Sequence, residues 1–230
     1  MMPLKYLFPL LIFLISMSSL QTKAQNRIGL RSGINWSQKR YLHTSIQKDI
    51  IGEQVPFVMG WNIGIPLEFR LSKHFALQPE ATLVSKSFQT NGQTFSIAPP
   101  HENISYYLLT VRRTSLEVPI LLKYYISNSS RGLYILAGPS LEWFLRQKDQ
   151  YLTFPIPPGD NIYQVFKTSN IFDRFKIGYG FGLGFTEQLG TTPIFGEIRY
   201  QTSWIDPSRQ HRYDSNTSFT VSIGVMLPTL

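Results

Sequence analysis

The sequence contains no cysteine. Disulfide bonds, thiol catalysis and cysteine-based metal sites are therefore excluded. The four histidines, His43, His74, His101 and His211, lie far apart in the chain, and none belongs to a metal-binding motif such as H-E-x-x-H. We therefore expect neither a metal nor a cofactor.

Long hydrophobic runs are missing as well. Beyond the first residues, no stretch approaches the roughly eighteen consecutive apolar residues that a membrane-spanning helix needs. Residues 1–24 combine Lys5, an apolar run from Tyr6 to Ile15 and a small-residue cleavage site at Thr22-Lys23-Ala24. This pattern predicts a secretory signal peptide over residues 1–24 and a single exported domain over residues 25–230.

Strict alternation of apolar and polar residues dominates the rest of the chain. In residues 59–71, every odd position from Met59 to Leu71 is apolar, whereas the even positions are glycine, proline, polar or charged. A period of two over this length predicts a β-strand long enough to cross a bilayer at a tilt. Similar alternation recurs at 27–36, 75–86, 116–125, 133–144, 175–186, 194–204 and 219–227.

The connections between these eight segments alternate between long and short. The long ones are 37–57, 87–113, 146–173 and 205–216, and within the second of them residues 106–111 can extend the following strand. An even number of strands with long external loops and short periplasmic turns is typical of outer-membrane barrels. The sequence therefore predicts an all-β fold: an eight-stranded antiparallel up-and-down transmembrane β-barrel in the cell outer membrane, with both termini in the periplasm.

Alternation alone also fits a soluble ligand-binding barrel, in which the apolar face would point inward. The tryptophans favour the membrane protein. Trp36, Trp61, Trp143 and Trp204 all fall at the long-loop ends of their segments and on the apolar face. Indole rings favour the membrane interface, so we expect these four residues to form one girdle.

The polar faces of the segments place ten charged residues in the predicted lumen. They are Arg31, Glu68, Arg70, Glu80, Lys86, Glu117, Lys123, Glu142, Glu197 and Arg199. A path for protons or ions would explain them, but an eight-stranded barrel has room only for side chains, and mixed signs allow pairing. We therefore expect a paired-charge core. The glycines at 178, 180, 182 and 184 leave space for large side chains inside such a narrow barrel.

The predicted external loops are basic. Their cations are Lys39, Arg40, Lys48, Arg112, Arg113, Arg146, Lys148, Lys167, Arg209 and Arg212, and the whole chain has a net charge of +8. For an exported protein the available anions are lipid headgroups and the phosphates of lipopolysaccharide. We therefore expect outer-membrane lipid, lipopolysaccharide and possible loop-bound proteins as partners, and no nucleic acid. A purely solvated loop surface is the alternative.

A catalytic alternative rests on Asp206, Ser208 and His211, which supply the residue types used by lipid A-modifying outer-membrane enzymes. Polar loops commonly contain these residues without any catalytic role. We therefore assign no catalytic residue and expect a protein that is not an enzyme.

Four motifs resemble one known family. They are L-Q-P-E at 77–80, L-E-V-P-I-L-L-K at 116–123, Y-I-L-A-G-P at 134–139 and G-E-I-R-Y at 196–200. In this order they resemble the PorT-like outer-membrane β-barrel family over essentially the whole exported chain. The resemblance implies an OmpA-like eight-stranded barrel of a Gram-negative cell envelope, in a family whose namesake is associated with protein secretion. It marks Glu80, Pro119, Lys123, Gly138 and Glu197 as family-typical barrel positions without a catalytic role.

Overall fold

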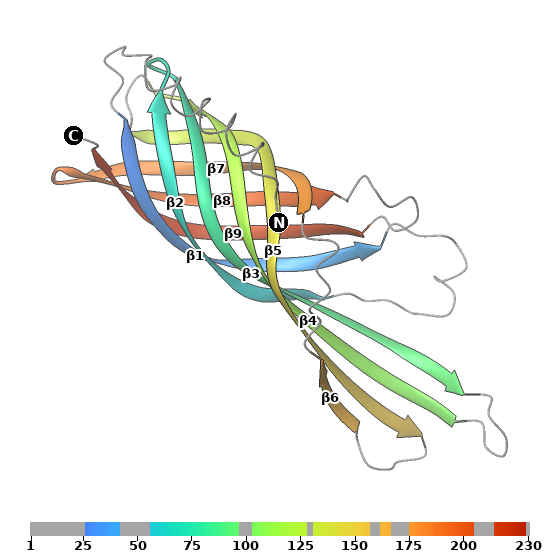
Figure 1. The fold of residues 1–230 in the computed structure, drawn as a ribbon. Helices are drawn as coiled ribbons and strands as arrows, with labels where there is room; N and C mark the ends of the chain where they lie inside the picture. Colours follow the sequence, from blue (N-terminus) through green and yellow to red (C-terminus); the bar gives the residue numbers. More distant parts are fainter. Residues whose placement is uncertain are drawn as a thin grey trace, which may run out of the picture.

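The protein is built from β-strands throughout the part of the chain that can be described (Figure 1). In this computed structural model the described residues are 26–41, 56–96, 103–127, 131–156, 162–166, 175–204 and 214–228. The strands are β1 (Arg27–Tyr41), β2 (Phe57–Arg70), β3 (Phe75–Ser96), β4 (Asn103–Tyr125), β5 (Gly132–Ile156), β6 (Ile162–Phe166), β7 (Phe175–Leu189), β8 (Thr192–Trp204) and β9 (Asp214–Pro228). Apart from Leu71, all eight alternating segments of the sequence lie in strands. The predicted signal peptide, residues 1–24, lies outside the described residues.

Eight of the strands close into a barrel. The order β4-β3-β2-β1-β9-β8-β7-β5 is completed by pairing between β4 and β5. All these pairs are antiparallel, and the β1–β9 pair that joins the two ends of the chain runs without a break from Arg27↔Pro228 to Tyr41↔Asp214. The predicted all-β, eight-stranded antiparallel up-and-down barrel is therefore confirmed. Within the described ranges, no helix is long and apolar enough to cross a membrane.

The barrel carries its apolar side chains on the outside. Leu183, Ile198 and Ile223 keep 62%, 60% and 67% of their surface exposed. Charged side chains face the interior, where Glu80 and Arg199 are only 2% and 1% exposed. An apolar exterior around a polar interior is the arrangement of a barrel that contacts lipid, and a soluble ligand-binding barrel would have the reverse.

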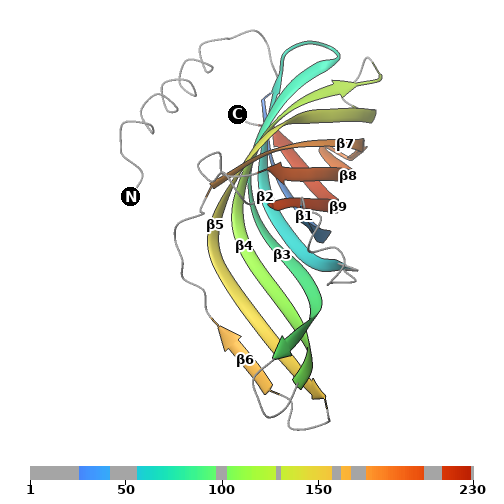
Figure 2. The same ribbon diagram turned by 90° about the vertical axis from the view of Figure 1, so that its right-hand side faces the viewer.

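Three of the barrel strands continue far beyond the others. The last described pair of β2 with β3 is Phe57↔Phe88, and the last pair of β5 with β7 is Trp143↔Phe175. Beyond these rows, β3, β4 and β5 remain paired with one another, and the short strand β6 adds to the edge of β5. Figures 1 and 2 show the result, a four-stranded sheet that projects from one end of the barrel. We call this sheet the arm; it comprises residues 89–96, 103–113, 146–156 and 162–166.

The arm corrects the prediction of loops over 87–113 and 146–173, most of which are strand. Asn91-Gly92 is a common hairpin turn, yet here both residues lie inside the β3–β4 ladder, opposite Leu108 and Tyr107. Neighbouring strands rich in aromatic and β-branched residues outweighed this local turn preference. The predicted loops over 37–57 and 205–216 also contain strand residues, because β1 continues to Tyr41 and β9 begins at Asp214.

A β-bulge marks the place where β5 leaves the barrel. Ser115 of β4 pairs with Phe144 and Thr114 pairs with Arg146, so Leu145 is an extra residue in β5. An extra residue of this kind bends the strand and increases its twist. It also changes which positions of β5 face inward. On the barrel side of the bulge Glu142 is buried. On the arm side the inward position is that of Gln147, which accepts a hydrogen bond from Arg113.

Candidate functional site

The barrel interior is filled by charged and polar side chains in three layers. In the middle layer, Glu80 of β3 accepts two hydrogen bonds from Arg199 of β8, with N···O distances of 2.8 and 2.6 Å. Arg31 of β1 lies 3.1 Å from the same carboxylate. Arg199 also pairs with Glu197, which in turn accepts a hydrogen bond of 2.7 Å from the Tyr134 hydroxyl. Two carboxylates and two guanidinium groups thus balance each other across the barrel.

The second layer lies towards the short-turn end. Lys123 of β4 forms an ion pair of 3.0 Å with Glu68 and donates a hydrogen bond of 2.9 Å to Gln78. The Tyr125 hydroxyl donates to the same Glu68 carboxylate at 2.7 Å. The Lys123 ammonium also lies 3.9 Å from the centre of the Tyr134 ring, a cation–π contact that helps to compensate for its burial.

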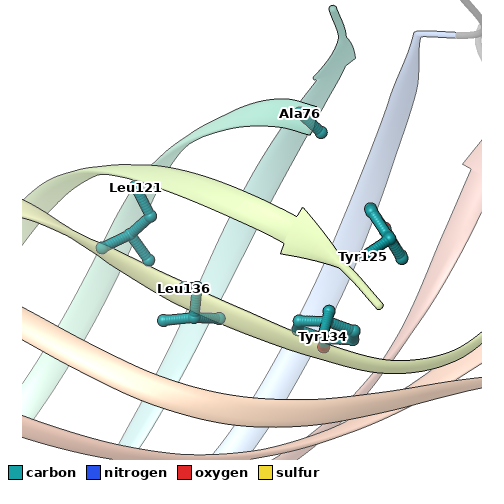
Figure 3. Close-up of a cluster of buried hydrophobic side chains, with 5 residues drawn as sticks. All are labelled: Ala76, Leu121, Tyr125, Tyr134 and Leu136. Carbon is teal, nitrogen blue, oxygen red and sulfur yellow. The ribbon is translucent and has the colours of Figure 1, made fainter. Parts of the chain in front are cut away.

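A small apolar cluster completes this end of the interior. It consists of Ala76, Leu121, Tyr125, Tyr134 and Leu136, all at most 2% exposed (Figure 3). The two tyrosine rings lie 5.4 Å apart and carry their hydroxyl groups to the carboxylates of two different layers. The tyrosines therefore connect the apolar cluster to the charge network.

The third layer lies towards the arm. The Lys86 ammonium pairs with Glu117 and, at 3.1 Å, with Glu142. Ser115 donates a hydrogen bond of 2.8 Å to Glu142, and Gln201 of β8 donates one of 3.3 Å to Glu117. All three charged groups are at most 4% exposed.

The ten predicted lumen residues occupy these layers. Nine of them are buried, and Arg70 is half-buried with its guanidinium 4.0 Å from the centre of the Tyr125 ring. The set holds five cations and five carboxylates. Lys176 of β7, which is 8% exposed and has its ammonium 5.4 Å from the centre of the Phe144 ring, adds a further buried cation that the prediction did not include. A few buried atoms still lack a partner, among them one oxygen each of Glu68 and Glu142. The described residues contain no group of three His, Asp or Glu residues suited to a metal ion.

Sequence reasoning missed several members of the network. Tyr125, Tyr134, Gln78 and Ser115 each donate a hydrogen bond to a buried carboxylate or connect two charged residues. All four lie on the same inward columns as the predicted charges. Their inward position was therefore available from the alternation, but their partners on other strands required the barrel register.

The glycine column of β7 provides space for this network. A Cβ atom at Gly184 would overlap the Tyr134 ring, and one at Gly182 would press on the Arg199 side chain. The absence of a side chain at these positions allows two large residues of neighbouring strands to lie across the narrow interior. The geometry at Gly182 and Gly184 agrees with the expectation that these glycines leave space for large side chains.

The comparison with family models decides the class of protein. The model described as "Outer membrane protein beta-barrel domain" matches residues 21–206, which is more than half of the chain. The chain belongs to this outer-membrane β-barrel family. It is therefore an outer-membrane protein, and the exposed apolar belt of the barrel is its lipid-facing surface.

The chain has only low sequence identity and low structural similarity to solved outer-membrane barrels. Ail of Yersinia pestis is 12% identical, with 88% of this chain and 99% of that chain covered and a TM-score of 0.40. OprG of Pseudomonas aeruginosa is 11% identical, with 90% and 98% covered and a TM-score of 0.41. The Neisserial surface protein NspA is 11% identical, with 89% and 97% covered and a TM-score of 0.38. No curated protein matches the chain.

Aromatic residues surround the outer-membrane barrel on its lipid face. Trp36 pairs with Met59 and Phe219 near the starts of β2 and β9, while Trp143 pairs with Phe175 at the start of β7. Trp61 is 47% exposed, and Trp204 ends β8, although its side chain lies outside what can be described. Phenylalanine and tyrosine, which the tryptophan pattern did not include, extend this belt: the rings of Phe181, Tyr200, Phe219 and Phe57 follow one another at centroid distances of 5.0, 5.2 and 5.8 Å.

The histidines and the residues of the catalytic alternative lie mostly outside the described part of this outer-membrane protein. Asp206, Ser208 and His211 lie outside the described residues, as do His43 and His101. His74, in the turn between β2 and β3, forms a hydrogen bond of 3.0 Å through Nδ1 with the Tyr125 backbone carbonyl and stacks on the Tyr124 ring. Its contacts are those of a turn-stabilising residue.

Proposed function

We propose that this outer-membrane barrel is a non-enzymatic interaction protein, which anchors the arm in the membrane and presents it to a partner outside the cell. The observation that carries the proposal is the contrast between the two parts of the molecule. The barrel interior is filled by a network of paired charged side chains, which leaves transport as a poor explanation for the fold. The arm, by contrast, adds nothing to barrel closure, since its rows lie beyond the last barrel pairs of β2 and β7.

The direction of the arm is part of the proposal. Outer-membrane barrels carry short turns on the periplasmic side and long connections on the outside. The arm and the ends of the long connections share one end of this barrel, so we assign that end to the cell surface and both termini to the periplasm. External segments 37–57, 87–113, 146–173 and 205–216 then provide the contact surface for a protein partner.

The absence of cysteine offers a direct test of this orientation, because one introduced thiol is unique in the chain. Gln150→Cys places it in the arm, and Lys73→Cys places it in the exposed turn between β2 and β3. A membrane-impermeant maleimide added to intact cells should label the first variant and not the second. After permeabilisation both should react. Labelling of Lys73→Cys alone in intact cells would reverse the orientation.

We extend the proposal to a role as an accessory of protein secretion, on the strength of the resemblance of four motifs to the PorT-like family. The test uses cells whose only copy of the protein lacks the arm. Loss of secreted proteins from the medium, with normal amounts of the barrel in the outer membrane, would support this role. Unchanged secretion would contradict it and would leave the interaction function to other partners.

A further inference from the structure

We propose that Arg112, Arg146 and Lys148 form a binding site for the phosphate groups of lipopolysaccharide at the base of the arm. We call these three residues the cationic row. This site would deepen the proposed interaction function. It rests on the proposed orientation, which places the base of the arm at the outer leaflet, where lipopolysaccharide lies.

The strand register brings the three cations together on one surface. Arg112 of β4 lies directly opposite Lys148 of β5. Arg146 is two residues from Lys148 on the same strand, and opposite Thr114. The alternation of a strand therefore places all three on the same face, on which Arg112 and Arg146 are exposed and Lys148 is half-buried.

The bulge at Leu145 determines that this face is the outer one. Below the bulge the even positions of β5 face inward, as the burial of Glu142 shows. Above it the inward position is taken by Gln147, which bonds to Arg113 at 2.7 Å. Without this shift by one residue, Arg146 and Lys148 would continue the inward column. With it, both cations belong to the outer surface.

No described residue neutralises the cationic row. None of its three members makes a hydrogen bond or ion pair with another described residue. The nearest carboxylate in sequence, Asp149, belongs to the opposite face, where the Gln147 amide donates to its two oxygens at 2.9 and 3.1 Å. Like charges directly opposite each other destabilise an antiparallel pair. An anion bound between Arg112 and Lys148 would remove this repulsion.

The height of the row matches the headgroup region of a membrane. The outward apolar column of β5 runs from Leu133 to Leu145, which are 58% and 57% exposed. At roughly 3.3 Å per residue along the strand and a tilt of about 40°, this column spans roughly 30 Å, slightly more than the apolar band of about 25 Å of an outer-membrane barrel. The cationic row begins at the next residue. The first polar groups of the lipid lie at the same level.

The chemistry of the row selects phosphate among the anions found there. A guanidinium group binds two phosphate oxygens at once, and an ammonium group adds a point charge. The three positive charges of the row exceed the single negative charge of a phosphodiester. A lipid that carries several phosphate groups can therefore pair with more of these cations. In the outer leaflet that lipid is lipopolysaccharide, through the phosphates of its lipid A portion.

The test measures lipid binding by the purified full chain in a neutral detergent. Titration calorimetry would compare lipid A with dephosphorylated lipid A, phosphatidylglycerol and inorganic phosphate. We expect the double variant Arg112→Gln/Arg146→Gln to bind lipid A at least about tenfold more weakly than the parent protein, because two charge-assisted contacts are lost. The charge-retaining variant Arg112→Lys/Lys148→Arg should keep most of the affinity. The control Lys73→Gln/Arg131→Gln, which removes two cations at the short-turn end, should bind as the parent does.

Three results would overturn the proposal. Equal binding of lipid A by the parent and the double variant would exclude the cationic row as the site. Equal binding of dephosphorylated lipid A would exclude phosphate as the recognised group, and equal affinity for phosphatidylglycerol or inorganic phosphate would exclude lipopolysaccharide as the specific source. The titration does not depend on orientation, so a failure of the thiol-labelling experiment would reject the proposed orientation separately.

Discussion

Glu80 is the carboxylate that joins three strands of the barrel in the middle layer. It accepts hydrogen bonds from Arg199 and Gln78 and forms an ion pair with Arg31, so strands β1, β3 and β8 meet at one carboxylate. Loss of one member of a buried ion pair leaves an uncompensated charge, which costs far more than the pair contributes relative to an apolar substitute. The contribution of Glu80 to stability therefore lies mainly in what its absence would leave behind.

Glu80→Gln should lower the free energy of unfolding by about 3–5 kcal/mol, because two buried arginines would then share one remaining carboxylate. Urea-induced unfolding in detergent micelles, followed by tryptophan fluorescence, would measure the loss. Adding Arg31→Met should recover part of it by removing one unpaired cation. Glu187→Gln, at the exposed end of β7, is the matched control and should leave the unfolding midpoint in place. Equal midpoints for both single variants would show that the network does not stabilise the barrel.

Gly184 is the residue whose lack of a side chain matters most for the tyrosine contacts. Gly184→Ala should cost about 1–3 kcal/mol, because the new methyl group would force the Tyr134 ring away from its place beside Glu197. The temperature at which the folded band disappears from a detergent gel would report the change. Gly196→Ala is the control, since the nearest atom to its added methyl group is 4.0 Å away. A melting temperature equal to that of the control would contradict the steric role.

At the scale of elements, the strands within the barrel and the arm differ in how well the sequence predicts them. Alternation located every barrel strand because one face meets lipid and the other meets the charged interior. In the arm that contrast disappears, so the alternation that identifies the barrel strands does not predict strands over residues 87–113 and 146–173. The bulge at Leu145 adds to the difficulty, because one extra residue reverses the inward and outward positions.

The arm should be removable without loss of the barrel. Gln89 and Thr110 are cross-strand partners, so residues 90–109 can be replaced by an Asn-Gly hairpin turn. In the same variant a Gly/Ser linker of equal length would replace residues 151–166. We expect this variant to keep the fast-migrating, heat-modifiable form on gels, because all barrel pairs remain. Absence of that form would show that the arm is required for barrel folding.

At the scale of the whole molecule, the sequence could predict which charges enter the lumen but not which of them meet. Glu80 and Arg199 are 119 positions apart, and their pairing depends on the closure of the whole barrel. Alternation assigns a face to each residue, whereas the register between strands and the tilt around the barrel set the height at which each residue lies. The three layers therefore became visible only with the complete fold.

A filled interior should not conduct. In planar lipid bilayers we expect the purified protein to produce no stable open-channel conductance, because paired charged side chains occupy the lumen at three levels. A porin reconstituted in the same membrane is the positive control. Reproducible single-channel steps that survive repeated purification would contradict a closed barrel and would redirect attention to an ion path through the network.

The charged interior also constrains how the barrel can be assembled. Each cation or carboxylate costs about 2.5–3.5 kcal/mol at the centre of a bilayer in insertion measurements, and the inward columns carry the ten predicted ones and Lys176. Strands inserted one at a time would expose these groups to hydrocarbon before their partners arrive. Closure of the β1–β9 seam and entry into the membrane must therefore be concerted, with the nascent inner face kept in contact with water or with an insertion machinery until the last strand is paired.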